Sequence, residues 1–314
     1  MDQAIQFYED NYQLLGSWFL QPGKKIILPG SSDKSCRFCG RAPPEVTYKL
    51  DAHAIPESLG NKTLFSEFEC DECNGFFGET IENDFGNWSK PTRTFARIRG
   101  KSGVPTLKKG SSGGWRIEYG PSGFKISEYE DDPILEVDEE ARRVTFKLKR
   151  DPYTPVAVLK AFVKMGLSLM PEGEMQNFVK ALTWIKQRDH SVGLVRDFPI
   201  VYSFIPGPLP NDRIAVMTFR RKEHVNDVLY AFLVLAYGNE VFQVFLPSPE
   251  RDQNIDGKEM TLLPFPNPHD AVPSKYGPVR RATLNLTERE IIRGQIVPVV
   301  LGFEHATRID HRTT

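Results

Sequence analysis

Cysteine is scarce in this chain of 314 residues: it has only four, and all of them lie between positions 36 and 73. Long hydrophobic runs are missing as well. No apolar stretch approaches the roughly 20 residues that a membrane-spanning helix requires, so we expect no membrane partner. The apolar stretch DVLYAFLVLAYG at 227–238 is too short to span, and we interpret it as a buried helix or strand.

Neither sign of charge is in excess: the chain has 40 lysines and arginines and 41 aspartates and glutamates, which gives a net charge of -1. The molecule as a whole is therefore not a polycation, and any binding to nucleic acid must come from local charge. The N-terminal stretch carries acidic residues and no basic n-region, unlike a signal peptide, so we expect a cytoplasmic protein. In that reducing compartment, paired cysteines indicate metal or redox chemistry sooner than a disulfide.

Changes in composition divide the chain into three parts. In residues 1–30, apolar side chains at helical spacing predict a helix over 3–20, followed by a short strand, KIIL. Residues 31–126 hold the cysteines and a basic, glycine-rich extension of short strand-like pieces. In residues 127–314 we predict two helices from position 151 onward and then strands divided by proline and glycine, which indicates an antiparallel sheet. The expected fold class is α+β.

The cysteines form two pairs of identical spacing, Cys36 and Cys39 in CRFCG, and Cys70 and Cys73 in CDECNGFFG. Four thiolates complete a tetrahedral zinc site that has no open position for chemistry. A redox pair or unrelated buried thiols are the alternatives, but thioredoxin-like chemistry uses one pair on a βαβ frame, which we do not find here. We therefore predict a structural zinc ion that supplies folding energy to a small unit with little core.

The segment between the cysteine pairs carries polar residues in a specific order. His53 follows a strand-like stretch and precedes Ile55 and Pro56, Asn61 lies in a Gly-Asn turn, and Asn74 follows the last cysteine at the start of a helix. A lone histidine is more often structural than catalytic. These elements, CRFCG, AHAIPESLGNK and ECDECNGFFG in this order, nevertheless resemble the HNH endonucleases that carry a four-cysteine zinc and have Asn in place of the last His.

The resemblance covers roughly residues 33 to 90 and implies an N-terminal zinc-stabilised ββα-metal module, followed here by a larger mixed α+β domain. It also implies a catalytic divalent ion, Mg²⁺ or Mn²⁺, separate from the zinc. In this family pattern His53 is the general base that takes a proton from the attacking water. Asn74 matches the residue that offers a neutral oxygen to the catalytic ion.

The chain departs from the family pattern at the position before the base, where many members have an acidic or histidine metal ligand. That position is Ala52 here, and the acid lies one residue earlier, at Asp51. Since alternate residues of a strand share a face, we hypothesise that Asp51 serves as the metal ligand beside His53. Asn61 is either the middle Asn of the motif or a turn residue that supports the histidine loop. The next candidates for the ligand are Glu82, Asn83 and Asp84.

A basic stretch, KPTRTFARIRGK, follows the module directly, and residues 90–109 contain seven lysines and arginines and no acid. Such side chains neutralise phosphates without reading sequence. The alternative is a solvated surface strand. The predicted phosphate-binding residues are Arg93, Arg97, Arg99 and Lys101.

Together these features predict a metal-dependent endonuclease that hydrolyses double-stranded DNA. By analogy with bacterial proteins that join this module to a second domain, we expect it to act in defence against foreign DNA. The resemblance also implies a homodimer, because a bare module of this family usually nicks one strand and a double-strand cut needs two active sites. Two alternatives stay open: a catalytically inactive, zinc-stabilised nucleic-acid-binding protein, and a regulatory protein whose zinc unit only dimerises. Residues 127–314 offer no chemistry that we can assign.

Overall fold

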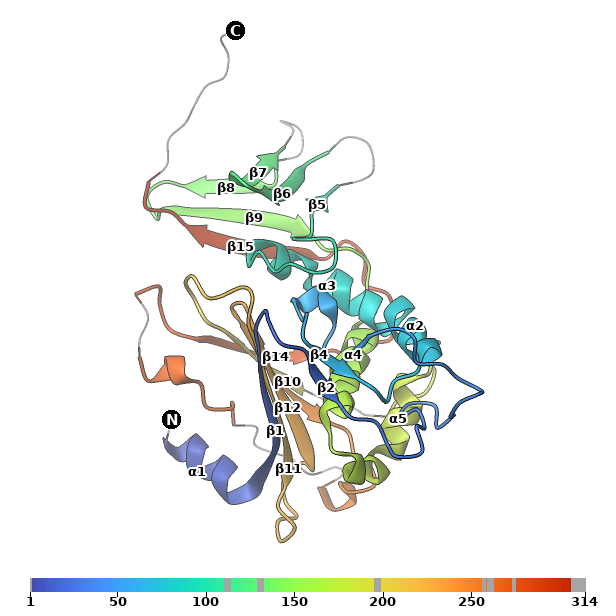
Figure 1. The fold of residues 1–314 in the computed structure, drawn as a ribbon. Coiled ribbons are helices and arrows are strands. Elements are labelled where there is room, and N and C mark those ends of the chain that lie inside the picture. Colours follow the sequence, from blue (N-terminus) through green and yellow to red (C-terminus); the bar gives the residue numbers. More distant parts are fainter. Residues whose placement is uncertain are drawn as a thin grey trace.

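The computed structural model describes residues 2–109, 114–128, 133–194, 199–255, 258, 263–272 and 275–305. Figure 1 shows a large sheet, a group of helices with the cysteine-bearing segment on one side of it, and a smaller layer of strands above. The predicted α+β class is confirmed. Among the described residues, no helix has both the length and the apolarity needed to cross a bilayer.

The large sheet has six strands in the order β1-β11-β12-β13-β10-β14, and every pair is antiparallel, as predicted for the C-terminal region. Residues 227–238 contain a strand and no helix, because this short run pairs with neighbours on both sides and ends in a two-residue Gly238-Asn239 hairpin. The strands are β1 (Tyr12–Leu20), β10 (Pro199–Phe204), β11 (Ile214–Arg221), β12 (Ala231–Tyr237), β13 (Glu240–Leu246) and β14 (Arg280–Asn285).

The predicted N-terminal helix over 3–20 is wrong in its second half. Helix α1 covers only Asp2–Asn11, and β1 follows at once and pairs with β11. The apolar spacing of this segment fits a helix, but pairing with a strand about 200 residues away decides the structure, since tertiary contacts override local propensity. The N-terminal segment thereby completes the C-terminal sheet.

The cysteine-bearing segment is a ββα unit. Strand β3 (Ala52–His53) pairs antiparallel with β4 (Leu64–Ser66), which also pairs in parallel with β2 (Ile26–Leu28). A short 3-10 helix, η1 (Glu57–Leu59), lies in the loop between β3 and β4. The helix predicted after the last cysteine is two helices, α2 (Asp71–Glu79) and α3 (Ile81–Phe95), separated at Thr80, so the basic stretch begins as helix and not as strand pieces.

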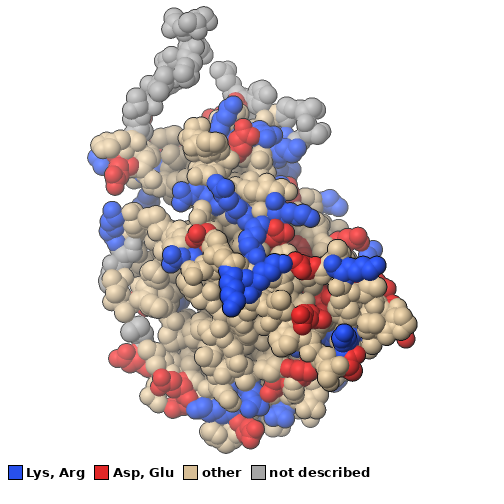
Figure 2. All heavy atoms as spheres, viewed as in Figure 1, with Lys and Arg blue, Asp and Glu red and all other residues tan. Residues whose placement is uncertain are grey.

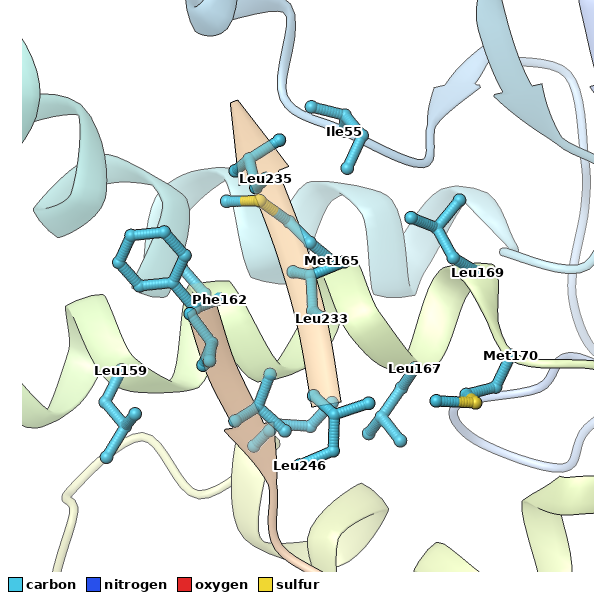
Figure 3. Packing of buried hydrophobic residues seen from close by; sticks show 14 of the residues in the cluster. Ile55, Leu159, Phe162, Met165, Leu167, Leu169, Met170, Leu233, Leu235 and Leu246 are labelled. Carbon is cyan, nitrogen blue, oxygen red and sulfur yellow. The ribbon is translucent and has the colours of Figure 1, made fainter. Parts of the chain in front are cut away.

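Helix α4 (Pro155–Leu169) lies at the centre of the molecule, and all of its residues are buried. The Phe162 ring contacts Phe85 of α3 at 5.1 Å between centroids and Phe242 of β13 at the same distance. Figure 3 shows apolar side chains of α4 packed against Leu233 and Leu246 of the large sheet, with Ile55 of the ββα unit nearby. The zinc unit, α4 and the sheet therefore share one core.

A smaller second core lies between two three-stranded sheets, in the orders β5-β6-β7 and β15-β9-β8. The domain boundaries that we placed after residues 30 and 126 remain predictions. Two strands connect the parts on either side of them: β1, in residues 1–30, pairs with β11 in residues 127–314, and β7 includes residues on both sides of the second boundary. The remaining elements are β5 (Leu107–Lys108), β6 (Arg116–Gly120), β7 (Gly123–Ser127), β8 (Leu135–Asp138), β9 (Arg143–Lys149), η2 (Glu172–Phe178), α5 (Val179–Ile185), η3 (Gln253–Ile255), η4 (Pro268–Asp270) and β15 (Ile296–Gly302).

Candidate active site

The structure brings the four cysteine sulfurs together, all within 4.8 Å of one another. Gly40 has a φ of +73°, and its N–H donates to the carbonyl of Cys36 at 2.7 Å, so the first pair closes the tight turn that its spacing predicts. A contact between the side chains of Cys36 and Cys73 is the largest cause of a lowered pKa at Cys36 and of a raised pKa at Cys73. Zinc binds thiolates, and four thiolates complete its tetrahedral site. This donor set fits the predicted structural zinc ion.

His53 lies at the end of β3, opposite Phe65 of β4. The two rings pack with their centroids 4.7 Å apart, and the imidazole is half-buried. Burial is the main reason why the pKa of His53 falls below its ordinary value, while Glu57 and Glu82 act in the opposite direction. The imidazole is therefore neutral near pH 7, which is the form that a general base requires.

Asn61 is fully buried in the loop between β3 and β4. Its Nδ2 donates to the carbonyls of Ile55 at 2.7 Å and Leu64 at 2.9 Å. Its Oδ1 accepts from the N–H groups of Thr63 and Leu64 at 3.1 and 2.9 Å. Because these bonds occupy both amide protons and the oxygen, they favour the interpretation in which Asn61 supports the histidine loop.

The two residues that we predicted as ligands of a catalytic ion lie on different elements. Asp51 is exposed just before β3, and its Oδ2 lies 2.8 Å from Nζ of Lys25, which holds the pKa of this carboxyl below its usual range. Asn74 is half-buried in the first turn of α2. Within the described ranges, the four cysteines are the only group of three or more Cys, His, Asp or Glu close enough to hold a metal. A catalytic ion here would keep several waters.

The prediction that Arg93 binds phosphate is wrong. The residue is buried on the inner side of α3, where Nη1 donates to the carbonyl of Ser58 at 2.9 Å and Nη2 donates to that of Gly86 at 2.8 Å. Its Nε donates to Oγ of Ser89 at 3.0 Å. All three nitrogens of the guanidinium therefore donate to groups inside the protein, where the side chain joins α3 to the loop that follows His53.

The rest of the basic segment lies on the surface. Arg99 and Lys101 are exposed, and Arg97 is half-buried. A Cβ on Gly100 would lie only 3.3 Å from Cα of Ser58, so the segment runs directly against η1. Figure 2 shows lysines and arginines gathered in a patch over the region where Figure 1 labels α3.

Sequence reasoning missed a buried charge cluster beneath His53. Nζ of Lys164, on α4, lies 3.0 Å from Oε2 of Glu69 and 3.1 Å from Oε1 of Glu82, and it donates to the carbonyl of His53 at 3.4 Å. Burial raises the pKa of Glu69 to about 7, and the charge of Lys164 opposes that rise. The available signal was the occurrence of lysines inside the otherwise apolar helix VLKAFVKMGLSL.

Sequence reasoning also missed Arg37, which lies inside the first cysteine pair. Its Nη1 donates to the carbonyls of Leu167, Ser168 and Met170 at 3.0 to 3.1 Å, at the C-terminal end of α4. The last carbonyls of a helix lack partners within it, and a cation there also matches the helix dipole. Both cysteine pairs are thus connected to α4, one through Arg37 and the other through Glu69, the neighbour of Cys70.

The comparison with protein families agrees with this geometry. A family model of HNH endonucleases matches residues 36–89, which begin at the first cysteine and end within α3. No curated protein and no solved structure matches the chain. The matched stretch contains both cysteine pairs, His53 and Asn74. Residues 36–89 are therefore a module of the HNH endonuclease family, held in this chain by a four-cysteine site suited to zinc.

Proposed function

We propose that this protein is a metal-dependent endonuclease that hydrolyses phosphodiester bonds of double-stranded DNA. One observation carries the proposal: the family match coincides with a ββα unit that contains both a half-buried, neutral imidazole at the end of β3 and four cysteines gathered at one point. A neutral imidazole at this position matches the general base of the family pattern.

The residues of the module have distinct parts in the proposed reaction. His53 accepts a proton from the water that attacks the phosphorus, and Phe65 and the loop held by Asn61 fix its ring. Asp51 and Asn74 would offer a carboxylate and an amide oxygen to Mg²⁺ or Mn²⁺, which are hard oxygen-binding ions. When bound, such an ion supplies positive charge that stabilises the leaving 3′ oxygen.

The proposed DNA contacts come from the surface basic segment. Arg97, Arg99 and Lys101 lie beside η1, where they would neutralise phosphates that flank the cut. A cut in both strands would require two modules and hence a homodimer. We also propose, by analogy with other proteins that join this module to a second domain, a cytoplasmic role in defence against foreign DNA.

A catalytically inactive nucleic-acid-binding protein is the second candidate. It is favoured by Ala52 at the usual ligand position, and by the pairing of Asp51 with Lys25. In that case the basic segment would still bind DNA, and the cysteine site would serve only the fold.

The test uses the purified full chain with supercoiled plasmid in Mg²⁺, in Mn²⁺ or in EDTA. The nuclease proposal predicts nicked or linear plasmid with either ion and intact plasmid in EDTA. Retardation of the plasmid at low salt with no cleavage in any condition would contradict it and select the inactive binding protein. The absence of both cleavage and binding would leave only a regulatory role.

A further inference from the structure

Helix α4 lies outside the HNH module, yet it carries two lysines that are buried as completely as its apolar residues. The exposed fraction is 0 % for Lys160 and 1 % for Lys164. Burying an ammonium group without partners costs several kcal/mol, so each lysine must be paired inside the protein. The partners of the two lysines differ, and this difference separates their roles.

Lys164 is surrounded by acceptors from three pieces of the nuclease module. They are the carbonyl of His53 on β3, the carboxylate of Glu69 next to Cys70, and the carboxylate of Glu82 in the first turn of α3. Because the ammonium group carries both donor protons and a positive charge, one side chain makes a hydrogen bond to the carbonyl and ion pairs with the two carboxylates. It thereby joins the strand, the second cysteine pair and the helix that together form the site.

Loss of this ammonium group would disturb the position of the imidazole directly. The accepting carbonyl belongs to His53 itself, so a shift of that peptide moves the Cα that carries the ring. Glu69 is fully buried, and without Lys164 its carboxylate would remain with no opposite charge beside it. The ion pairs of Lys164 with Glu69 and Glu82 would be lost as well, so α4 would no longer join the second cysteine pair to α3.

The position of Lys164 is in turn set by parts of the chain beyond residues 36–89. Phe162 packs against Phe242 of the large sheet, and Leu246 approaches the helix at Gly166. From within the module, Arg37 of the first cysteine pair adds to this by binding the last carbonyls of the same helix. Figure 3 shows this packing between α4 and the sheet.

We propose that Lys164 is a positioning residue for the nuclease site, through which α4 fixes the backbone of His53, the second cysteine pair and α3 in the cleavage-competent arrangement. The proposal rests on the proposed nuclease function. It assigns a role at the site to the region after residue 126, for which the sequence offered no chemistry.

Lys160 provides a matched control, one helical turn away on α4. Its Nζ donates to the carbonyl of Gln187 at 2.8 Å and lies 3.0 Å from Nδ1 of His190. Within the described part of the chain, these contacts differ from the three that Lys164 makes. The test compares Lys164→Met with Lys160→Met in the full chain. Because the single Lys164 variant leaves the fully buried carboxylate of Glu69 unpaired, the double variant Lys164→Met/Glu69→Gln removes that charge as well and leaves only the partly exposed carboxylate of Glu82.

The measurements are kcat and KM for DNA cleavage, zinc content, and the ring ¹⁵N signals of His53, identified by their loss in His53→Ala. A displaced catalytic group costs about 100-fold in rate, so we expect that loss of kcat in the double variant, with KM and zinc content unchanged. The His53 signals should shift or broaden in the same variant. Lys160→Met should retain both the wild-type kcat and the wild-type His53 signals.

Two results would overturn the proposal: a double variant with wild-type kcat and His53 signals, or a Lys160→Met variant that loses as much kcat as the double variant. The ring signals also separate this proposal from the nuclease function. If the wild type cleaves no DNA, the nuclease function fails, and unchanged His53 signals in the double variant would still refute the positioning role.

Discussion

Removal of zinc is expected to unfold the large sheet together with the HNH module, in one cooperative transition. Structural zinc sites bind with about 10–16 kcal/mol, which is comparable to the roughly 5–15 kcal/mol that stabilises a whole protein. The cysteine pairs connect to α4 through Arg37 and Glu69, and α4 fills the core beneath the sheet. Loss of the metal therefore removes partners from a core that both parts share.

Calorimetry and far-ultraviolet circular dichroism on the full chain, with and without a zinc chelator, measure this effect. Cys70→Ser should reproduce the chelator result, and added zinc should restore the chelated wild type but not the variant. Two separate transitions, with the sheet melting at the same temperature in both conditions, would show that the module and the sheet fold independently. The shared core would then contribute little to either part.

Replacement of His53 by alanine should reduce the kcat of DNA cleavage by about 100- to 10,000-fold, the usual contribution of a general base. The ring is half-buried and packs on Phe65, so the change removes the proton acceptor and only part of one packing contact. Zinc content and DNA affinity should therefore stay near the wild-type values. Cleavage of a labelled duplex under single-turnover conditions measures the rate.

His224→Ala is the matched control, since His224 is exposed and lies outside the module. It should cleave at the wild-type rate. A His53→Ala protein that also cleaves at that rate would exclude this imidazole as the base, and the cleavage would then have to be assigned to another group or to a contaminant.

The local part of the site could be predicted from the sequence because its parts lie close together in the chain. Two cysteine pairs of equal spacing, with His53 between them and Asn74 directly after them, indicate one metal site and one ββα unit. The structure gathers the four sulfurs, and the family match covers the same stretch. Short-range spacing is sufficient for such a unit, since zinc fixes the relative positions of its pieces.

The contacts that the sequence did not predict join distant residues. His53 and Lys164 are 111 positions apart, and Arg37 reaches carbonyls at least 130 positions away. No local pattern specifies such pairs. The same limit explains why Tyr12–Leu20 was predicted as helix, since its strand partner β11 lies about 200 residues further along the chain.

Arg93 shows a related limit within a single helix. The basic stretch is evident in the sequence, but which of its side chains face outward depends on how far α3 continues and how it is rotated against the module. The helix extends to Phe95, so Arg93 points into the protein and the exposed positions begin after it.

The central claim is that the four-cysteine module presents His53 and Asn74 to a hydrated divalent ion distinct from zinc. Crystals of the full chain in Mn²⁺, measured by anomalous diffraction on both sides of the zinc and manganese absorption edges, test it most directly. The account predicts a zinc peak among the four sulfurs and a manganese peak beside His53 and Asn74, the second of which Asp51→Ala should remove. Zinc among the sulfurs with no manganese peak beside His53 would contradict it.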